Sequence, residues 1–286
     1  MKFSVLLSVY AKESPVYLEQ ALESVLNQTL MPNEIVLVED GPLTSALYMV
    51  IERYEKTYDS FFRCVPLKKN VGLGRALNQG VLECQYPFIA RMDTDDIAKL
   101  DRFEKQVEAF RTNPELSLVG GWIEEFSDSP NEITSIRSVP LSHQELVRYA
   151  KRRNPINHMT VMFRRQAVLE AGNYLPMALS EDYYLWYRLI EKGFLLCNLP
   201  DILVSVRGGK EMIARRGGFQ YWQSERELQN IFLASGFISR REYLQNIAVR
   251  FVARMIPGGI REFLYRKLLR KKAWLYSRSS GNGMIV

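Results

Sequence analysis

Short apolar runs alternate with helix-forming stretches through residues 3–120 of the chain. Ser14 followed by Pro15 is a favourable start for the first of these helices, because proline fits the first helical position. Alternation of this kind predicts a mostly parallel sheet with helices on both faces, which is the α/β class. The expected strands are residues 3–9, 34–38, 61–67, 86–92 and 116–120, and the expected helices begin near residues 15, 44, 72 and 100.

The chain beyond residue 120 has a more mixed pattern of short strands and helices. It contains neither an internal repeat nor a low-complexity linker, so residues 1–220 are expected to form one domain. Residues 221–286 are expected to form a helical extension, interrupted at Pro257-Gly258-Gly259. The strands expected here are residues 158–163 and 202–206, and the helices are residues 181–192, 221–233, 239–256 and 260–274.

The composition permits a packed core, since 47% of the residues are hydrophobic and 12% are aromatic. The cysteines, Cys64, Cys84 and Cys197, are dispersed without CxxC spacing, which argues against a disulfide framework or a zinc site and favours a reducing cytoplasm. No stretch approaches the ~18 to 20 apolar residues of a membrane-spanning helix. The first apolar run lacks a small-residue cleavage site and is expected to be a strand, not a signal peptide.

Positive charge is concentrated near the C-terminus. The net charge is +6, and residues 245–286 hold nine lysines and arginines against one acid, Glu262, so the rest of the chain is close to neutral. Apolar residues interleave with these cations, as in amphipathic helices that lie on anionic membranes. Nucleic acid is the other common partner of such charge, but no nucleic-acid-binding motif accompanies it. We therefore expect residues 245–275 to bind an anionic membrane surface, with a helix docked on a protein partner as the alternative.

Three carboxylates, Asp93, Asp95 and Asp96, follow directly on the apolar run at residues 86–92. Carboxylates this close repel one another unless a cation compensates their charge. Their hard oxygens suit Mn²⁺ or Mg²⁺ bridging the phosphates of a diphosphate ligand. The alternative is an acidic turn, since aspartate often caps a helix, and one of the three is expected to act only as a cap.

A second acidic group, at residues 39–41, ends another expected strand, at the edge where parallel α/β sheets bind their ligands. Within it, Asp40 suits the imide hydrogen of a nucleotide base, although Asp-Gly-Pro is also turn chemistry. Residues 70–75 offer glycines for close backbone approach, a helix start and a cation for a diphosphate. The residues expected to contact the nucleotide here are Lys69, Gly72 and Arg75.

Five separated motifs occur in a characteristic order along the chain. They are Ser8-Val9-Tyr10, Glu39-Asp40-Gly41, Asn70-x-Gly72-x-x-x-Ala76-x-Asn78-x-Gly80, Asp93-Thr94-Asp95-Asp96 and Glu181-Asp182. Together they resemble the inverting family 2 glycosyltransferases of the GT-A fold, over residues 3–207. The resemblance implies a Rossmann-like, mostly parallel central sheet flanked by helices, a nucleotide-sugar donor and a divalent metal. Uridine diphosphate is the nucleotide that it favours, with thymidine diphosphate next.

Three further features resemble, within that family, bacterial exopolysaccharide, capsule and O-antigen transferases of the amylovoran-synthesis type. They are residues 154–158, residues 215–218 and the basic C-terminal region. This narrower resemblance implies a carrier-linked saccharide acceptor in cell-surface polysaccharide synthesis. Smaller residues are usual near Arg75 in the family, so this position departs from its pattern. The motifs say little about the sugar, because pocket shape decides it.

The resemblance also assigns residues to the donor. It places Asp40 at the base, Asp93 near the ribose and Asp95 on the metal, whereas the residues themselves do not choose between Asp95 and Asp96. Tyr10, in the first motif, is expected to contact the nucleotide as well.

Other residues are expected near the acceptor and the phosphates. The resemblance makes Asp182 the base that removes the proton of the acceptor hydroxyl during inversion, although acids are favourable in the first turn of any helix. Glu181, His158 and Trp186 are expected near the acceptor, and Arg207 is expected to face the diphosphate. His158 has an equal alternative as a hydrogen-bonded, half-buried histidine, and Trp186 has one as a core residue.

The patterns and the family resemblance together imply a metal-requiring, inverting glycosyltransferase of hexosyltransferase type that extends a polysaccharide unit on a lipid-linked carrier. It is expected to be cytoplasmic and peripheral on the inner face of the cell membrane. The alternative is a non-catalytic subunit that binds nucleotide sugar or membrane and organises an assembly. An NAD-linked dehydrogenase and a nucleotidyltransferase are disfavoured, because residues 10–14 lack the glycine-rich first loop of those enzymes.

Overall fold

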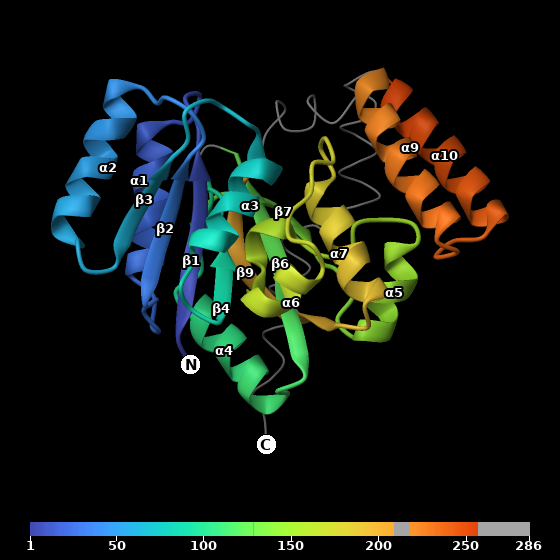
Figure 1. Ribbon diagram of the computed structural model, residues 1–286, viewed down its shortest axis with the longest axis horizontal. Coiled ribbons are helices and arrows are strands. Elements are labelled where there is room, and N and C mark those ends of the chain that lie inside the picture. Colours follow the sequence, from blue (N-terminus) through green and yellow to red (C-terminus); the bar gives the residue numbers. More distant parts are fainter. Residues whose placement is uncertain (128, 209–217, 257–286) are drawn as a thin grey trace.

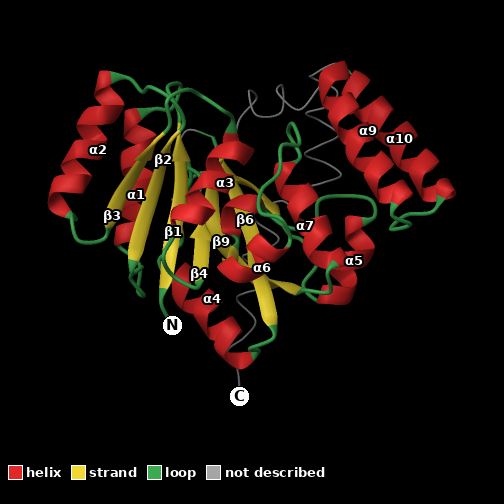
Figure 2. Ribbon diagram, viewed as in Figure 1, coloured by secondary structure: helices red, strands yellow, loops and turns green. Residues whose placement is uncertain are grey.

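The computed structural model of the protein describes residues 1–127, 129–208 and 218–256 (Figure 1). In these residues nine strands form one sheet, and helices pack on both of its faces (Figure 2). The strand order is β3-β2-β1-β4-β8-β6-β9-β5, with β7 paired to β6. The predicted α/β architecture around a mostly parallel central sheet is confirmed.

The N-terminal half of the sheet is parallel. β1 (Phe3–Val9) lies between β2 (Glu34–Glu39) and β4 (Phe88–Arg91), and β3 (Phe62–Pro66) pairs with the outer side of β2. β1 runs parallel to both of its neighbours. The carboxyl ends of these three strands therefore meet at one edge of the sheet, which is where such folds bind ligands.

The other half of the sheet is mixed. β8 (Met162–Arg164) is antiparallel to both β4 and β6 (Leu116–Phe126), while β9 (Leu195–Arg207) is parallel to β6. β5 (Ile97–Ala98) pairs antiparallel with β9, and β7 (Ile133–Arg137) with β6. Since β5 follows the acidic segment directly, its pairing brings the end of β9 next to that segment.

Helices enclose an apolar core on each face of the sheet. One core receives its buried leucines, valines and phenylalanines from α1 (Pro15–Leu26), α2 (Ser45–Thr57) and α4 (Arg102–Thr112). The other core is covered by α3 (Leu73–Glu83), α6 (Arg165–Glu170) and α7 (Glu181–Glu191). The starts of α1, α2, α3, α4 and α7 agree with the helices expected from the sequence, including the Ser14-Pro15 start of α1, whereas α6 was not expected.

The last described helices, α9 (Phe219–Ala234) and α10 (Arg240–Met255), lie side by side near α7 and α5 (His143–Ala150) (Figure 1). A third apolar cluster joins α9 to α7. α5 and α10 both begin with a capping box, in which a serine and the glutamate three residues later bond each other's backbone. None of the helices in the described residues is long and apolar enough to cross a membrane. The helix expected at 260–274 and most of segment 215–218 lie outside the described residues.

Three strand predictions differ from the structure. The strand expected at 202–206 begins earlier, at Leu195, and forms part of the longer β9. The strand expected at 116–120 continues to Phe126, because Gly120 and Gly121 do not end it but make room for β9: a Cβ at Gly120 would lie 2.3 Å from Asn198 Oδ1. The strand expected at 158–163 is a 3₁₀ turn, η1 (His158–Thr160), before β8 begins. The Thr160 hydroxyl donates to the Asn157 carbonyl at 2.7 Å, and this local bond competes with strand pairing.

Two buried polar side chains of α4 hold the carboxyl end of β4 in place. Arg102 is fully buried and donates from Nη2 to the Arg91 carbonyl at 2.7 Å and from Nε to Gln106 Oε1 at 3.1 Å. Gln106 Nε2 donates to the carbonyls of Val119 and Thr160 at 2.9 and 2.8 Å. The end of β4 is thereby tied to β6 and to η1.

Candidate active site

The polar groups predicted for the site leave the sheet from adjacent strands. Val9 of β1 pairs in register with Glu39 of β2, and β4 pairs with the other side of β1. Asp40 and segment 92–96 therefore emerge at the same edge. Tyr10, which follows β1 directly, is 38% exposed there.

The three aspartates after β4 form a tight cluster. Oxygens of Asp93, Asp95 and Asp96 all lie within 4.8 Å of one another. Burial, followed by the charges of Asp93 and Glu13, raises the pKa of Asp95 to about 7. Burial, followed by the charges of Asp95 and Asp93, raises the pKa of Asp96 well above its usual range. The protein therefore compensates the negative charge of this cluster only in part.

A divalent cation fits this cluster, because carboxylate oxygens are hard ligands and the ion would supply the missing positive charge. The expectation that one aspartate caps a helix is wrong. The segment continues into β5, and the N-cap of the next helix, α4, is Asp101.

Arg91 is a site residue that the sequence reasoning did not select. It is 1% exposed and contacts both carboxylate oxygens of Asp93: Nη1 donates to Oδ2 at 2.8 Å, and Nη2 forms an ion pair with Oδ1. Asp93 is thus already bonded to a cation of the protein, which leaves Asp95 and Asp96 as the less compensated pair. A basic residue ending a buried strand directly before three acids was the available signal.

Asp40 is 4% exposed and anchors the glycine loop. Its Oδ1 accepts the backbone N–H of Val71 at 2.7 Å and its Oδ2 accepts that of Gly72 at 3.0 Å. Gly41 has φ +88°, and a Cβ there would lie 2.4 Å from the backbone nitrogen of Asn70. The turn chemistry of the alternative is therefore present, while the contact of Asp40 with a nucleotide base stays a prediction.

The basic and glycine residues predicted to contact the nucleotide lie beside Asp40. Gly72, with φ +86°, is the N-cap of α3, and Lys69 and Arg75 are exposed on either side of it. Their positions leave them accessible to a ligand at the same edge of the sheet.

Glu181 and Asp182 form the first turn of α7. Asp182 Oδ2 accepts from Asn154 Nδ2 at 2.6 Å, and its Oδ1 accepts its neighbour's backbone N–H at 2.7 Å. Burial raises the pKa of Asp182, and burial together with the charge of Asp182 raises the pKa of Glu181 to about 7. A Cβ at Gly74 would lie 3.1 Å from Glu181 Cβ, so this turn touches the glycine loop.

The aromatic residues expected near the acceptor belong to the core. Trp186 is fully buried, so the alternative of a core residue holds. His158 is 9% exposed, and its Nε2 lies 2.9 Å from the Tyr174 hydroxyl. Burial and the charge of Arg91 lower the pKa of His158 well below its usual range, so the ring is neutral. The structure favours the alternative of a buried, hydrogen-bonded histidine.

Arg207 ends β9 beside the acidic cluster. Its backbone N–H donates to Asp96 Oδ1 at 2.9 Å, and its Nη2 donates to Gln20 Oε1 at 2.8 Å. The guanidinium carbon lies 3.7 Å from the ring centre of Tyr17. Protein groups therefore already hold its guanidinium, and the contact of Arg207 with a diphosphate stays a prediction.

Comparison with known proteins agrees with this arrangement. A family model described as Glycosyl transferase family 2 matches residues 4–172. The amylovoran biosynthesis glycosyltransferase AmsE of Erwinia amylovora is 42% identical over 268 residues, which cover 93% of this chain and 98% of the relative. The Escherichia coli UDP-Gal:alpha-D-GlcNAc-diphosphoundecaprenol beta-1,3-galactosyltransferase is 35% identical over 270 residues, covering 94% of this chain and 97% of the relative.

A solved structure shares the fold. The mannosyltransferase PcManGT from Pyrobaculum calidifontis, in complex with GDP-Man and Mn²⁺, has a TM-score of 0.61 at 15% sequence identity. The alignment covers 99% of this chain and 76% of that one.

The acidic cluster predicts a specific response to metal. Mn²⁺ should raise the thermal unfolding temperature of the native protein, and Asp95→Asn should weaken Mn²⁺ binding at least tenfold, about 1.4 kcal/mol, because it removes a hard ligand. Calorimetric titration measures the affinity. Asp101→Asn, which removes the same charge at the exposed start of α4, is the control, and equal Mn²⁺ affinities in the two variants would contradict the site.

The close approach at Gly41 predicts a second result. Gly41→Ala should lower the free energy of unfolding by about 1 to 2 kcal/mol from its positive φ and by about 1 to 3 kcal/mol more from the clash with Asn70. Gly236→Ala is the matched control, because Gly236 has φ +80° but a Cβ there meets nothing within 4 Å. Urea denaturation measures the free energy of unfolding of both variants. An equal decrease in the two would show that the loop at Asn70 moves away from the added Cβ without an energetic cost.

Proposed function

The chain belongs to glycosyltransferase family 2, and from that premise we propose that it transfers a sugar, with inversion, from a nucleotide-sugar donor to a lipid-linked saccharide in the synthesis of a cell-surface polysaccharide. The observation that carries the proposal is the convergence, at one sheet edge, of a metal-suited acidic cluster, an anchored glycine loop and a hydrogen-bonded carboxylate.

The names of two relatives support the choice of substrates. The Escherichia coli relative is named for UDP-Gal and for a GlcNAc-diphosphoundecaprenol acceptor, and AmsE is named for amylovoran biosynthesis. We therefore assign a UDP-sugar as donor and a saccharide on a diphosphate-linked lipid as acceptor. Both relatives match this chain over nearly their whole lengths.

On the donor side, the residues of the acidic cluster have distinct roles in the proposal. Asp95 and Asp96 hold a divalent Mn²⁺ or Mg²⁺, which when bound offsets the charge of the departing nucleoside diphosphate. Asp93, fixed by Arg91, faces the ribose. Asp40 holds the loop that carries Gly72, and it accepts from the nucleotide base.

On the acceptor side, Asp182 is the base. It takes the proton of the acceptor hydroxyl while that oxygen attacks the anomeric carbon, and the nucleoside diphosphate departs from the opposite face. A carboxylate suffices because the hydroxyl becomes acidic only as the new bond forms. Asn154 keeps one of its oxygens hydrogen-bonded, so the carboxylate is held in a single orientation. The alternative of a non-catalytic subunit is not favoured, since AmsE and the galactosyltransferase are both named as transferases.

We also propose that the protein works at the inner face of the cell membrane, peripherally bound. α10 carries exposed apolar side chains at Leu244, Val249, Phe251, Val252 and Met255. Arg250 and Arg254 instead form ion pairs with Glu225, so two of the nine C-terminal cations are occupied inside the protein. The other seven follow residue 256 in the sequence. An apolar row next to this run of cations suits an anionic lipid surface.

The assignment of Asp182 predicts that Asp182→Asn keeps Mn²⁺-dependent binding of a UDP-sugar and loses transfer by roughly 10² to 10⁴-fold, because general-base catalysis contributes that much. Calorimetry measures donor binding against a panel of nucleotide sugars, and release of nucleoside diphosphate in the presence of acceptor measures transfer. Asp59→Asn, at an exposed position between α2 and β3, is the control. Equal transfer by Asp182→Asn and the native protein would refute the mechanism.

Membrane binding predicts a charge-dependent affinity for vesicles. Replacing Arg270, Lys271 and Lys272 by glutamine should weaken binding to phosphatidylglycerol vesicles about 100-fold, since each cation contributes on the order of 1 kcal/mol. Leu244→Ser with Val249→Ser should also weaken it, because both side chains are exposed on α10. Replacing Lys56 and Arg111 by glutamine is the control, and the same affinity for neutral phosphatidylcholine vesicles would count against the proposal.

A further inference from the structure

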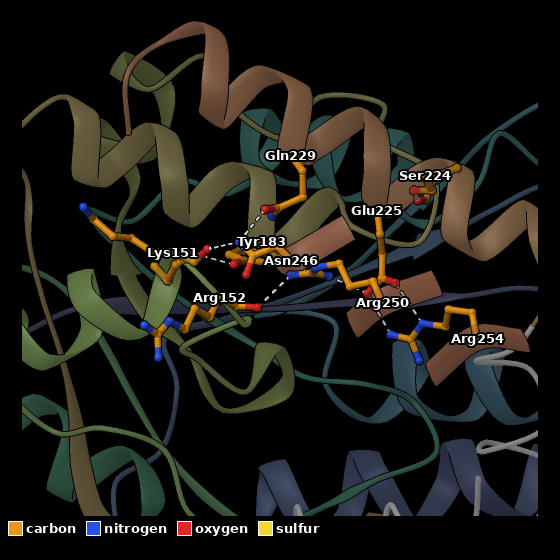
Figure 3. A network of polar contacts seen from close by, with 11 residues as sticks. Lys151, Arg152, Tyr183, Ser224, Glu225, Gln229, Asn246, Arg250 and Arg254 are labelled. Atoms are coloured by element: carbon orange, nitrogen blue, oxygen red, sulfur yellow. Dashed lines mark hydrogen bonds and ion pairs between the residues drawn. The ribbon is translucent and has the colours of Figure 1, made fainter. Parts of the chain in front are cut away.

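The α9–α10 pair is joined to the rest of the protein by more than apolar packing. Phe232 of α9 contacts the α7 tyrosines Tyr183 and Tyr187, and Leu228 belongs to the same third apolar cluster. Beside this cluster lies a set of polar side chains between α9, α10 and the segment that follows α5 (Figure 3). Gln229 is fully buried in it, and Asn246 and Glu225 are 8% and 6% exposed.

These side chains bind backbone carbonyls of the segment after α5. Asn246 Nδ2 donates to the Lys151 carbonyl and to Gln229 Oε1, each at 2.7 Å. Arg250 Nη2 donates to the Arg152 carbonyl at 2.8 Å, while its Nη1 bonds Glu225 at 2.6 Å. Two successive carbonyls are therefore fixed by α10 (Figure 3). The Asn246 amide is buried, and a buried amide is costly to leave unpaired, so its bond to the Lys151 carbonyl restrains the segment.

The restrained segment leads directly to Asn154, whose side chain donates to Asp182 at 2.6 Å. Arg137 of β7 donates to the Asn154 carbonyl at 3.1 Å, and Asn154 Oδ1 accepts the backbone N–H of Ile156 at 3.3 Å. On the other side, the hydroxyl of Tyr183 donates to the Ala150 carbonyl. Segment 150–154 is thus held between α10 and α7, and its last residue, Asn154, is hydrogen-bonded to the Asp182 carboxylate.

We propose that Asn154 is a positioning residue for the Asp182 carboxylate and that α10, through Asn246 and Arg250, holds Asn154 in place. The inference rests on the proposed function, in which Asp182 is the base. A neutral amide donor suits this role, because it fixes one carboxylate oxygen and favours the ionised form that takes the proton. The C-terminal helices are then part of the apparatus that supports the active site, whatever they bind on their outer face.

The electrostatics of Asp182 agree with this role. Burial raises the pKa of Asp182, and the hydrogen bond from Asn154 is the largest influence that lowers it again. Arg91 and Arg137 also lower the pKa of Asp182, and Glu181 beside it has a raised pKa because of burial and the charge of Asp182. Loss of the Asn154 bond should therefore make the carboxylate harder to ionise.

The test is the pH dependence of kcat in the full-length protein. In Asn154→Ala the acid limb of the profile should move to higher pH by about one unit, so that kcat falls about tenfold at pH values below the acid limb of the native profile, while the KM for the UDP-sugar stays as in the native protein. Asn246→Ala should move the limb in the same direction by a smaller amount. Calorimetric binding of donor with Mn²⁺ confirms that each variant is folded, and Asn154→Ser takes the place of Asn154→Ala if that variant does not fold.

Tyr243→Phe is the matched control. The Tyr243 hydroxyl donates to Asn230 Oδ1 at 2.7 Å, so the substitution removes a bond between α9 and α10 without touching segment 150–154. Its profile should equal that of the native protein. A native profile in Asn154→Ala, with Asp182→Asn inactive, would overturn the positioning role and leave the proposed base intact. A shifted profile in Asn154→Ala with native profiles in both Asn246→Ala and an Arg250→Gln variant would overturn the part assigned to α10. Full activity of Asp182→Asn would instead overturn the proposed function itself.

Discussion

The buried guanidinium of Arg91 is the charge around which the carboxylates of the site are arranged. It bonds both oxygens of Asp93, and its charge opposes the effect of burial on the pKa of Asp95, Asp96 and Asp182. The same charge disfavours a proton on His158. One guanidinium does not neutralise this many acids, and the remaining imbalance is what makes a divalent cation suitable at the cluster. The position of Arg91 depends in turn on Arg102, which binds its carbonyl from α4.

The C-terminal helices connect this charged centre to the outer surface. Their inner side reaches the carbonyls of Lys151 and Arg152, and through Asn154 it reaches Asp182. Their outer side presents an apolar row on α10. Two of the basic residues in this region, Arg250 and Arg254, form ion pairs with Glu225 inside the protein.

The alternation of strands and helices could be predicted from the sequence because local patterns and tertiary contacts favour the same elements over most of the chain. Thr44 and Ser239 each cap the helix expected to begin there, and Pro15 occupies the first turn of α1. The predictions failed where a local or long-range contact outweighed the pattern. Residues 158–163 alternate like a strand, but the Thr160 hydroxyl closes a turn on Asn157. Gly120 resembled a strand end, and only the approach of β9 explains why the strand continues.

For the site, the sequence by itself determined the residue types and their order: acids after β2 and β4, a glycine loop before α3 and an acidic pair at the start of α7. These are local properties, since strand ends and helix starts are set by neighbouring residues. The tertiary structure alone decided which partners these groups have. It placed Asn154 on Asp182 and Trp186 in the core. Such contacts join residues that strand register and helix packing bring together, and neither spacing nor composition in one sequence encodes them.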